Sequence, residues 1–199
     1  MKIFSQQQLK DWDKYTIQQQ HILSLDLMEM AANACLKWIL EHFQSNEFRI
    51  ICGPGDNGGD GLALARLLDD RKHSVKVYRI KSERYSADNI SNLEKLKLTN
   101  VEMIENIDTF FDSFTVNTVL MDAVFGTGLN KPLTGMALKI IQKANLISCH
   151  KISIDIPSGL SSDNLLPAFS TAFKATYTLT FQAPKLAFMY PKNEAYVGE

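Results

Sequence analysis

A run of nine residues containing five glycines, Gly53 to Gly61, constrains the fold of this chain more than any other feature. It follows a short apolar segment, residues 48–52, and precedes a segment rich in strong helix formers, residues 62–68. Glycines allow positive φ and let a ligand approach the start of a helix, where free N–H groups attract anions. The run therefore predicts a strand, a phosphate-binding turn and a helix, in that order.

The glycine spacing from residue 53 to residue 58 also matches the dinucleotide-binding fingerprint Gly-x-Gly-x-x-Gly, which is a weak signal alone. In that motif an acidic residue about 20 positions later binds the ribose. Here the second strand-like segment, residues 74–80, carries Arg79 and is followed by Lys81. An NAD-linked dehydrogenase is therefore disfavoured, whereas Arg79 and Lys81 are compatible with a 2′-phosphate. The alternative, a tight turn whose glycines serve packing, stays open.

Composition indicates one domain that binds a small molecule. The 199 residues are 45% hydrophobic, and a formal net charge of −1 gives no indication of a nucleic-acid or membrane surface. Cys35, Cys52 and Cys149 form no Cys-x-x-Cys pair, which is typical of reduced thiols. The N-terminus lacks the apolar core of a signal peptide, and no apolar run is long enough to span a membrane. We therefore expect a cytoplasmic protein.

Hydrophobic periodicity predicts strands and helices in alternation after two N-terminal helices. The predicted helices are residues 5–20, 24–43, 60–70, 86–97 and 133–145. The predicted strands are residues 48–52, 74–80, 101–104, 118–125, 151–156 and 175–181. Alternation of this kind indicates an α/β protein with a parallel sheet.

Polar residues follow several of the predicted strands. Ligands bind outside the carboxyl ends of an open parallel sheet, and loops rich in glycine and polar side chains are expected there. Asp122 and Asp155 lie near the ends of apolar strands, where a charge is costly to bury unless it is paired, hydrogen-bonded or bound to a cation. Capping of the next loop is the alternative role for either carboxylate.

The histidines do not belong to these loops. They are His21, His42, His73 and His150, in the N-terminal helices or just before strands. A Ser-His-Asp or Cys-His arrangement is therefore disfavoured. General acid–base chemistry would fall to carboxylates, with Asp155 the first candidate.

Four motifs can now be compared with known families: Gly-Pro-Gly-Asp-Asn-Gly-Gly-Asp-Gly (53–61), Asp-Ala-Val-Phe-Gly-Thr-Gly-Leu-Asn-Lys-Pro-Leu (122–133), Asp-Ile-Pro-Ser-Gly-Leu (155–160) and Thr-Phe-Gln-Ala-Pro-Lys (180–185). Together they resemble the NAD(P)H-hydrate epimerase family, also called the YjeF N-terminal domain, over about residues 6–191. The segment Leu27-Met28-Glu29 is similar to that family's N-terminal signature. The resemblance implies a three-layer α/β/α Rossmann-like fold with a mostly parallel sheet. It also implies an isomerase that interconverts the R and S forms of hydrated NADH or NADPH, so that a dehydratase specific for the S form can repair both.

The resemblance further implies roles for particular residues. Asp155 would lie beside the nicotinamide and act as acid or base while the C6 hydroxyl leaves or returns. Asn57, Asp122 and Ser158 would hold a potassium ion, which prefers oxygen ligands of these kinds. The residues expected to contact the hydrated dinucleotide are Asp56, Asn57, Gly58, Gly59, Asp60, Gly126, Thr127, Gly128, Leu129, Asn130, Lys131, Pro132 and Asp155.

The chain departs from the family pattern in two ways. Asp56 stands where the family usually has asparagine, which adds a negative charge near the expected phosphates and potassium. Residues 1–199 are expected to be one domain truncated at its C-terminus, because the family commonly continues into another strand; a dehydratase could be fused or separate. The rival reading is a non-catalytic nucleotide-binding or scaffolding member, against which the presence of Asn57, Asp122, Asp155 and Ser158 argues. A homodimer and the choice between NADH-hydrate and NADPH-hydrate stay open.

Overall fold

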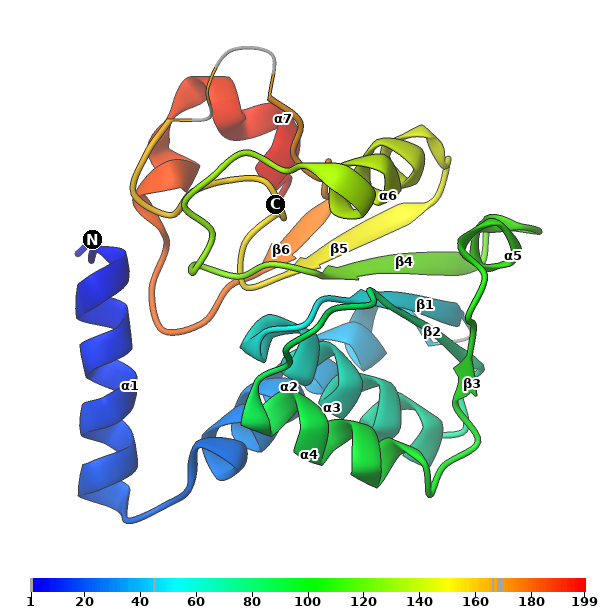
Figure 1. The fold of residues 1–199 in the computed structure, drawn as a ribbon, viewed down its shortest axis with the longest axis horizontal. Coiled ribbons are helices and arrows are strands. Elements are labelled where there is room, and N and C mark those ends of the chain that lie inside the picture. The colour runs from blue at the N-terminus through cyan, green and yellow to red at the C-terminus, as the bar shows by residue number, and fades with distance from the viewer. Residues whose placement is uncertain (1, 45, 166, 168–169) are drawn as a thin grey trace.

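The computed structural model describes residues 2–44, 46–165, 167 and 170–199, and these form a six-stranded parallel sheet (Figure 1). The strands are β1 (Glu47–Cys52), β2 (Val75–Arg79), β3 (Glu102–Met103), β4 (Thr118–Ala123), β5 (His150–Ile154) and β6 (Tyr177–Leu179). Their order across the sheet is β3-β2-β1-β4-β5-β6. The strand order reverses between β1 and β4, so the ligand-binding crevice of such a sheet is expected outside the carboxyl ends of these two strands.

Helices cover both faces of the sheet, which confirms the predicted three layers (Figure 1). One face carries α2 (Ser24–His42), α3 (Asp56–Asp70) and α4 (Ala87–Leu96), and the other carries α5 (Ile107–Phe111) and α6 (Gly135–Leu146). Along β1, Ile50 belongs to the apolar cluster on the α3 side and Ile51 to the cluster on the α6 side. Both faces of the central strands are therefore buried, which explains why their sequences are apolar throughout rather than alternating.

The first helix, α1 (Gln6–Gln20), stands apart from these layers at one edge of the molecule (Figure 1). It begins with a capping box, in which the Ser5 hydroxyl accepts from the Gln8 N–H and the Gln8 side chain accepts from the Ser5 N–H. Leu9 is its buried residue. After β6 the chain forms the short turns η1 (Leu186–Met189) and η2 (Pro191–Asn193) and the helix α7 (Glu194–Val197).

Several predicted boundaries were wrong. The helix after the glycine run begins at Asp56 and not at residue 60, because most of the run is helix rather than loop. The last two strands are shorter than predicted: β5 ends at Ile154 and β6 spans three residues. The short helices α5 and α7 were not predicted. α5 has only five residues and depends on a local cap, since the Asn106 side chain accepts from the backbone N–H groups that follow it.

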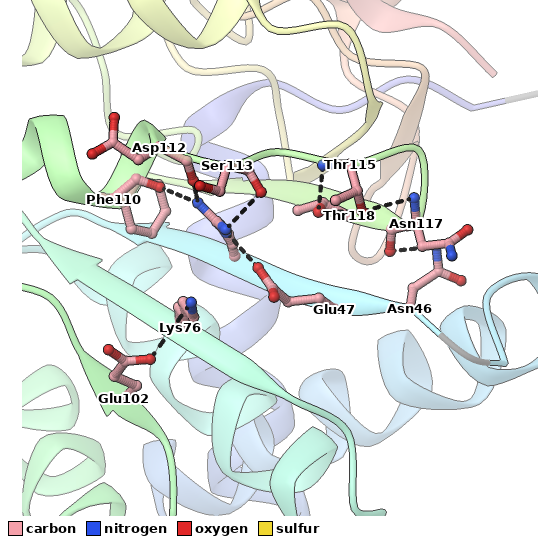
Figure 2. Close-up of polar contacts among 11 residues, drawn as sticks. Asn46, Glu47, Lys76, Glu102, Phe110, Asp112, Ser113, Thr115, Asn117 and Thr118 are labelled. Atoms are coloured by element: carbon pink, nitrogen blue, oxygen red, sulfur yellow. Dashed lines mark hydrogen bonds and ion pairs between the residues drawn. The ribbon is translucent and has the colours of Figure 1, made fainter.

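A buried arginine of β1 holds α5 against the amino end of the sheet; Figure 2 labels its partners Phe110, Asp112, Ser113 and Glu47. The Arg49 side chain is 3% exposed and donates to the carbonyl oxygens of Phe110 (2.6 Å), Asp112 (2.5 Å) and Ser113 (3.3 Å). It also pairs with Glu47 at 2.5 Å. The three carbonyl oxygens belong to α5 and the turn after it. The Arg49 side chain therefore ties the connection between β3 and β4 to β1.

We expect Arg49→Met to lower the free energy of unfolding by about 3 kcal/mol, because several buried carbonyl oxygens lose a charged donor. The matched control is Lys76→Met, which removes a partly exposed pair with Glu102 at 3.7 Å (Figure 2) and should cost less than about 1 kcal/mol. Urea denaturation of both variants measures the difference. Equal losses in the two variants would contradict the role given to Arg49.

Candidate functional site

A buried carboxylate joins the ends of two neighbouring strands beside the expected crevice. Asp122, the next-to-last residue of β4, is 0% exposed. Its Oδ1 accepts from the Ser158 hydroxyl at 2.6 Å, and its Oδ2 accepts from the Ser158 N–H at 2.7 Å. The Ser158 Oγ accepts in turn from the Phe125 N–H at 2.8 Å. These bonds fix the loop after β5 against the loop after β4.

The Asp122 carboxylate has no Lys or Arg partner among the described residues. Burial raises its pKa from the ordinary 3.8 to about 6, although the hydrogen bonds from Ser158 oppose this rise. The described part of the chain also shows no group of three or more His, Cys, Asp or Glu side chains that could hold a metal ion. A cation near Asp122 would therefore be held by one carboxylate with neutral oxygens, which suits an alkali metal better than zinc.

Asn57 supplies such a neutral oxygen in the first turn of α3. It is 7% exposed, and both Oδ1 and Nδ2 lack a hydrogen-bond partner among the described residues. A Cβ placed on Gly126 would lie 3.3 Å from the Asn57 Cβ and 3.0 Å from Asp155 Oδ2. Gly126 thus lies between the two side chains, and any larger residue there would crowd them. An unpaired buried amide at this point is consistent with a missing ligand.

Four of the five glycines of the run serve close packing, and the fifth, Gly55, has open space where a Cβ would lie. None of the five has a positive φ, so the run does not use the left-handed conformation that glycine allows. A Cβ on Gly58 would lie 1.9 Å from the Gly53 carbonyl oxygen, and one on Gly61 would lie 2.6 Å from the Ala123 Cβ. A Cβ on Gly59 would lie 3.0 Å from Met28 Sδ, which gives the Leu27-Met28-Glu29 segment a packing role. The packing alternative therefore accounts for these positions, and the close approach brings the start of α3 to the ends of β1 and β4.

Asp155 lies one residue beyond β5, in a left-handed backbone conformation with φ 69°. Its side chain is 12% exposed. Oδ2 accepts from the Thr127 N–H at 3.2 Å, and Oδ1 forms an ion pair with Lys185 Nζ at 3.0 Å. Sequence reasoning missed Lys185 as a site residue, although the motif ending in this lysine was noted. Three loops from separate strands therefore meet at Asp155.

Two further carboxylates surround this point. Asp60, on α3, is half-buried; burial raises its pKa well above the ordinary value, and the negative charges of Asp155 and Asp56 add to the rise. Asp13, on α1, accepts a hydrogen bond from Gln182, and burial raises its pKa as well. Sequence reasoning did not place α1 at the site, because nothing in the helical pattern shows where an exposed polar helix will dock. The site therefore gathers more negative than positive charge.

Other predicted contact residues lie further out. Gly126 and Thr127 adjoin Asp155, but Gly128, Asn130, Lys131 and Pro132 are exposed, and Leu129 packs against the apolar cluster on the α6 side. Asp56 is exposed at the first position of α3. The loop after β4 thus has an inner part at the carboxylate and an outer part open to solvent.

Arg79 lies at the position where the dinucleotide motif would have an acidic residue, and its side chain is linked through Asn89 to the glycine run. It donates to Asn89 Oδ1 (2.7 Å from Nη2), and its guanidinium lies 3.5 Å from the centre of the Tyr85 ring. The Asn89 amide donates to the carbonyl oxygens of Gly53 and Gly55. Arg79 therefore holds the turn before α3 in place through Asn89.

The fold and this site define a Rossmann-like α/β protein with a group of carboxylates beside the switch point of its sheet. The family model described as YjeF-related protein N-terminus matches residues 24–187. The chain belongs to this family.

Named relatives and a solved structure agree with this assignment. The NAD(P)H-hydrate epimerase of Oenococcus oeni is 33% identical over 197 residues, which cover 98% of this chain and 91% of the relative. The bifunctional NAD(P)H-hydrate repair enzyme Nnr of Dictyoglomus turgidum is 32% identical over 205 residues, covering 100% of this chain and 39% of that longer protein. The crystal structure of the yeast protein ynu0, YNL200c, has the same fold, with a TM-score of 0.82 at 21% identity over 95% of this chain and 84% of that chain. None of the described helices is both long and apolar enough to cross a membrane.

We expect Asp60→Asn to stabilise the protein at pH 8 and to change little at pH 4. The raised pKa means that the folded chain holds the Asp60 proton more tightly than the unfolded chain, so stability is lost as the pH rises through the folded value. Asparagine does not titrate, and the melting temperature at pH 8 should rise by about 3 °C or more. Glu83→Gln, an exposed change in the loop before α4, is the control. An Asp60→Asn shift that is independent of pH would contradict this account.

Proposed function

We propose that this protein epimerises the R and S forms of hydrated NADH and NADPH. The observation that most supports this proposal is the position of the Asp155 carboxylate. Lys185 and the Thr127 N–H hold it where three strand-end loops meet. The relatives that match nearly the whole chain bear the name NAD(P)H-hydrate epimerase. A family member that had lost its chemistry would have no reason to retain a buried ion pair and an unpaired amide at this place.

The reaction inverts one carbon, C6 of the reduced nicotinamide. When the C6–O bond breaks, its electrons leave with the oxygen, which takes a proton and departs as water. The ring is left as a cation in which nitrogen shares the positive charge. Water then adds from the other face and gives up one proton. Asp155 accepts or returns this proton. Asp60, whose pKa is raised, is a carboxyl group suited to supply the proton that the departing oxygen takes.

The excess of carboxylates suits this cationic intermediate. Besides burial, the negative charge of Asp155 raises the pKa values of Asp13 and Asp60, and the charge of Asp13 adds to the rise at Asp60. Fixed negative charges aimed at a site of developing positive charge stabilise it without reorganisation. The free N–H groups at the start of α3 remain the natural place for the pyrophosphate.

A potassium ion is part of this proposal. Asn57, Asp122 and Ser158 fit such an ion, since the Asn57 amide oxygen is buried without a partner and the Asp122 carboxylate is buried without a countercharge. When bound, the ion would supply positive charge that keeps Asp122 ionised and fixes the loops around the dinucleotide. Asp122 would then be a structural anion and Asp155 the reacting one.

The activity places the protein in nicotinamide-nucleotide repair beside a dehydratase, either a separate chain or a fused domain like that implied by the name of the bifunctional relatives. We place this activity in the cytoplasm, where the three free cysteines would remain reduced. The rival scaffolding role predicts a site that tolerates loss of Asp155. An NAD-linked dehydrogenase is disfavoured, because Arg79 occupies the end of β2.

The direct test supplies purified protein with R-enriched NADH-hydrate and follows the epimer ratio by chromatography. The wild type should speed equilibration, and Asp155→Asn should lower kcat about 100-fold or more, because the acid–base group is lost while its shape is kept. Asp163→Asn is the control, since Asp163 lies in the same region but accepts from the Gln6 N–H instead. Wild-type protein that leaves the uncatalysed rate unchanged would contradict the proposed function.

The potassium proposal is tested without substrate. Potassium chloride, compared with choline chloride at equal ionic strength, should raise the melting temperature by about 2–4 °C. Asn57→Ala and Asp122→Asn should each remove this difference, while Asp60→Asn should keep it. A salt response that is the same for both chlorides would show that no specific cation site exists.

A further inference from the structure

A lysine ammonium group is buried directly behind Asp155. The Lys185 side chain is 1% exposed. Its Nζ lies 3.0 Å from Asp155 Oδ1, 2.7 Å from the Phe181 carbonyl oxygen and 3.2 Å from the Ala183 carbonyl oxygen. All three N–H bonds of the ammonium are therefore used within the protein, and the group cannot reach a substrate.

Two of these three acceptors belong to the turn that carries the lysine. The Ala183 N–H donates to the Phe181 carbonyl at 2.7 Å, and Gln182 between them has a φ of 62°. Lys185 thus closes its own turn, and its position does not depend on Asp155. The Lys185 ammonium group is held by its own turn, and the Asp155 carboxylate pairs with it there.

The carboxylate is fixed from the other side as well. The Asp155 N–H donates to the Leu179 carbonyl on β6 at 2.8 Å, and the residue is held at a positive φ. With Oδ1 held by Lys185, Oδ2 is directed at the Thr127 N–H and lies 3.0 Å from the position of a Cβ on Gly126. One oxygen of Asp155 is anchored, and the other faces the loop after β4.

Stability alone is a poor explanation for this arrangement. A buried ion pair often contributes little net stability, because desolvation of both charges offsets their attraction. An arrangement that fixes one oxygen of a reacting carboxylate and directs the other at the loop after β4 has a clear use, because small displacements of a reacting group lower rates strongly.

We propose that Lys185 is a positioning residue, which orients the Asp155 carboxylate for proton transfer and affects the reaction only through Asp155. The proposal rests on the proposed epimerase function, but the geometry it describes can be tested without substrate. Loss of a lysine that binds substrate would raise KM, whereas loss of a lysine that positions Asp155 would lower kcat.

The kinetic test is a double-mutant cycle of Lys185→Met and Asp155→Asn. Lys185→Met should lower kcat about 10- to 100-fold with KM within about threefold of the wild type. In the Asp155→Asn background, Lys185→Met should change kcat less than about twofold. A kcat near the wild-type value in the single variant, or the same loss in both backgrounds, would overturn the proposal.

The matched control is Lys151→Met. Lys151 is a partly buried lysine at the other end of β5 that donates to the Ile147 carbonyl at 2.5 Å. Its loss should affect the melting temperature and leave kcat unchanged. If Lys185→Met does not fold, Lys185→Gln replaces it in the same cycle, because glutamine keeps a donor without the charge.

A second readout uses no substrate. In the proton–nitrogen spectrum of the labelled protein, the Thr127 amide proton reports its bond to Asp155 Oδ2. Lys185→Met should shift this signal and Lys151→Met should not. An unmoved Thr127 signal overturns the positioning role even if the wild type is inactive, whereas an inactive wild type with the expected shift contradicts only the proposed function.

Discussion

The close approach of α3 to the carboxyl ends of β1 and β4 is the constraint on which the rest of the site depends. It requires that Gly53, Gly58 and Gly61 have no side chain, because a Cβ at any of them would overlap a neighbour at 1.9–2.6 Å. The result is that Asn57 is buried beside Gly126 and Asp155 rather than held away from the sheet. A packing requirement thus creates the place where a polar amide, two strand-end loops and a carboxylate meet.

Charge is the second organising feature. Asp122 is satisfied by Ser158 and carries a raised pKa, whereas Asp155 is paired with Lys185. Two carboxylates at adjacent strand ends therefore have different environments, and this difference supports separate roles, one structural and one reactive. Asp60 has no ion-pair partner in the described part of the chain, and burial raises its pKa well above the ordinary value, so its ionisation costs stability.

Much of this could be predicted from sequence, and the failures have physical causes. The alternation of apolar strands with helices predicted the parallel sheet, and the polar residues after each strand predicted the edge where Asp122, Asp155 and Ser158 meet. The start of α3 at Asp56, inside the glycine run, could not be predicted. Glycine has a low helix propensity, and here only tertiary packing overrides it. Lys185 and Asp13 were missed because a buried ion pair and the docking of an exposed helix depend on three-dimensional contacts without a local sequence pattern.

The most direct test of the central claim is a crystal structure of the protein with NADPH in potassium-containing solution. The account predicts the pyrophosphate at the start of α3 and the nicotinamide C6 within about 4 Å of Asp155 Oδ2, directly or through one water. Density for a cation is expected beside Asn57, Asp122 and Ser158. A dinucleotide bound elsewhere, or with its nicotinamide directed away from Asp155, would contradict the account.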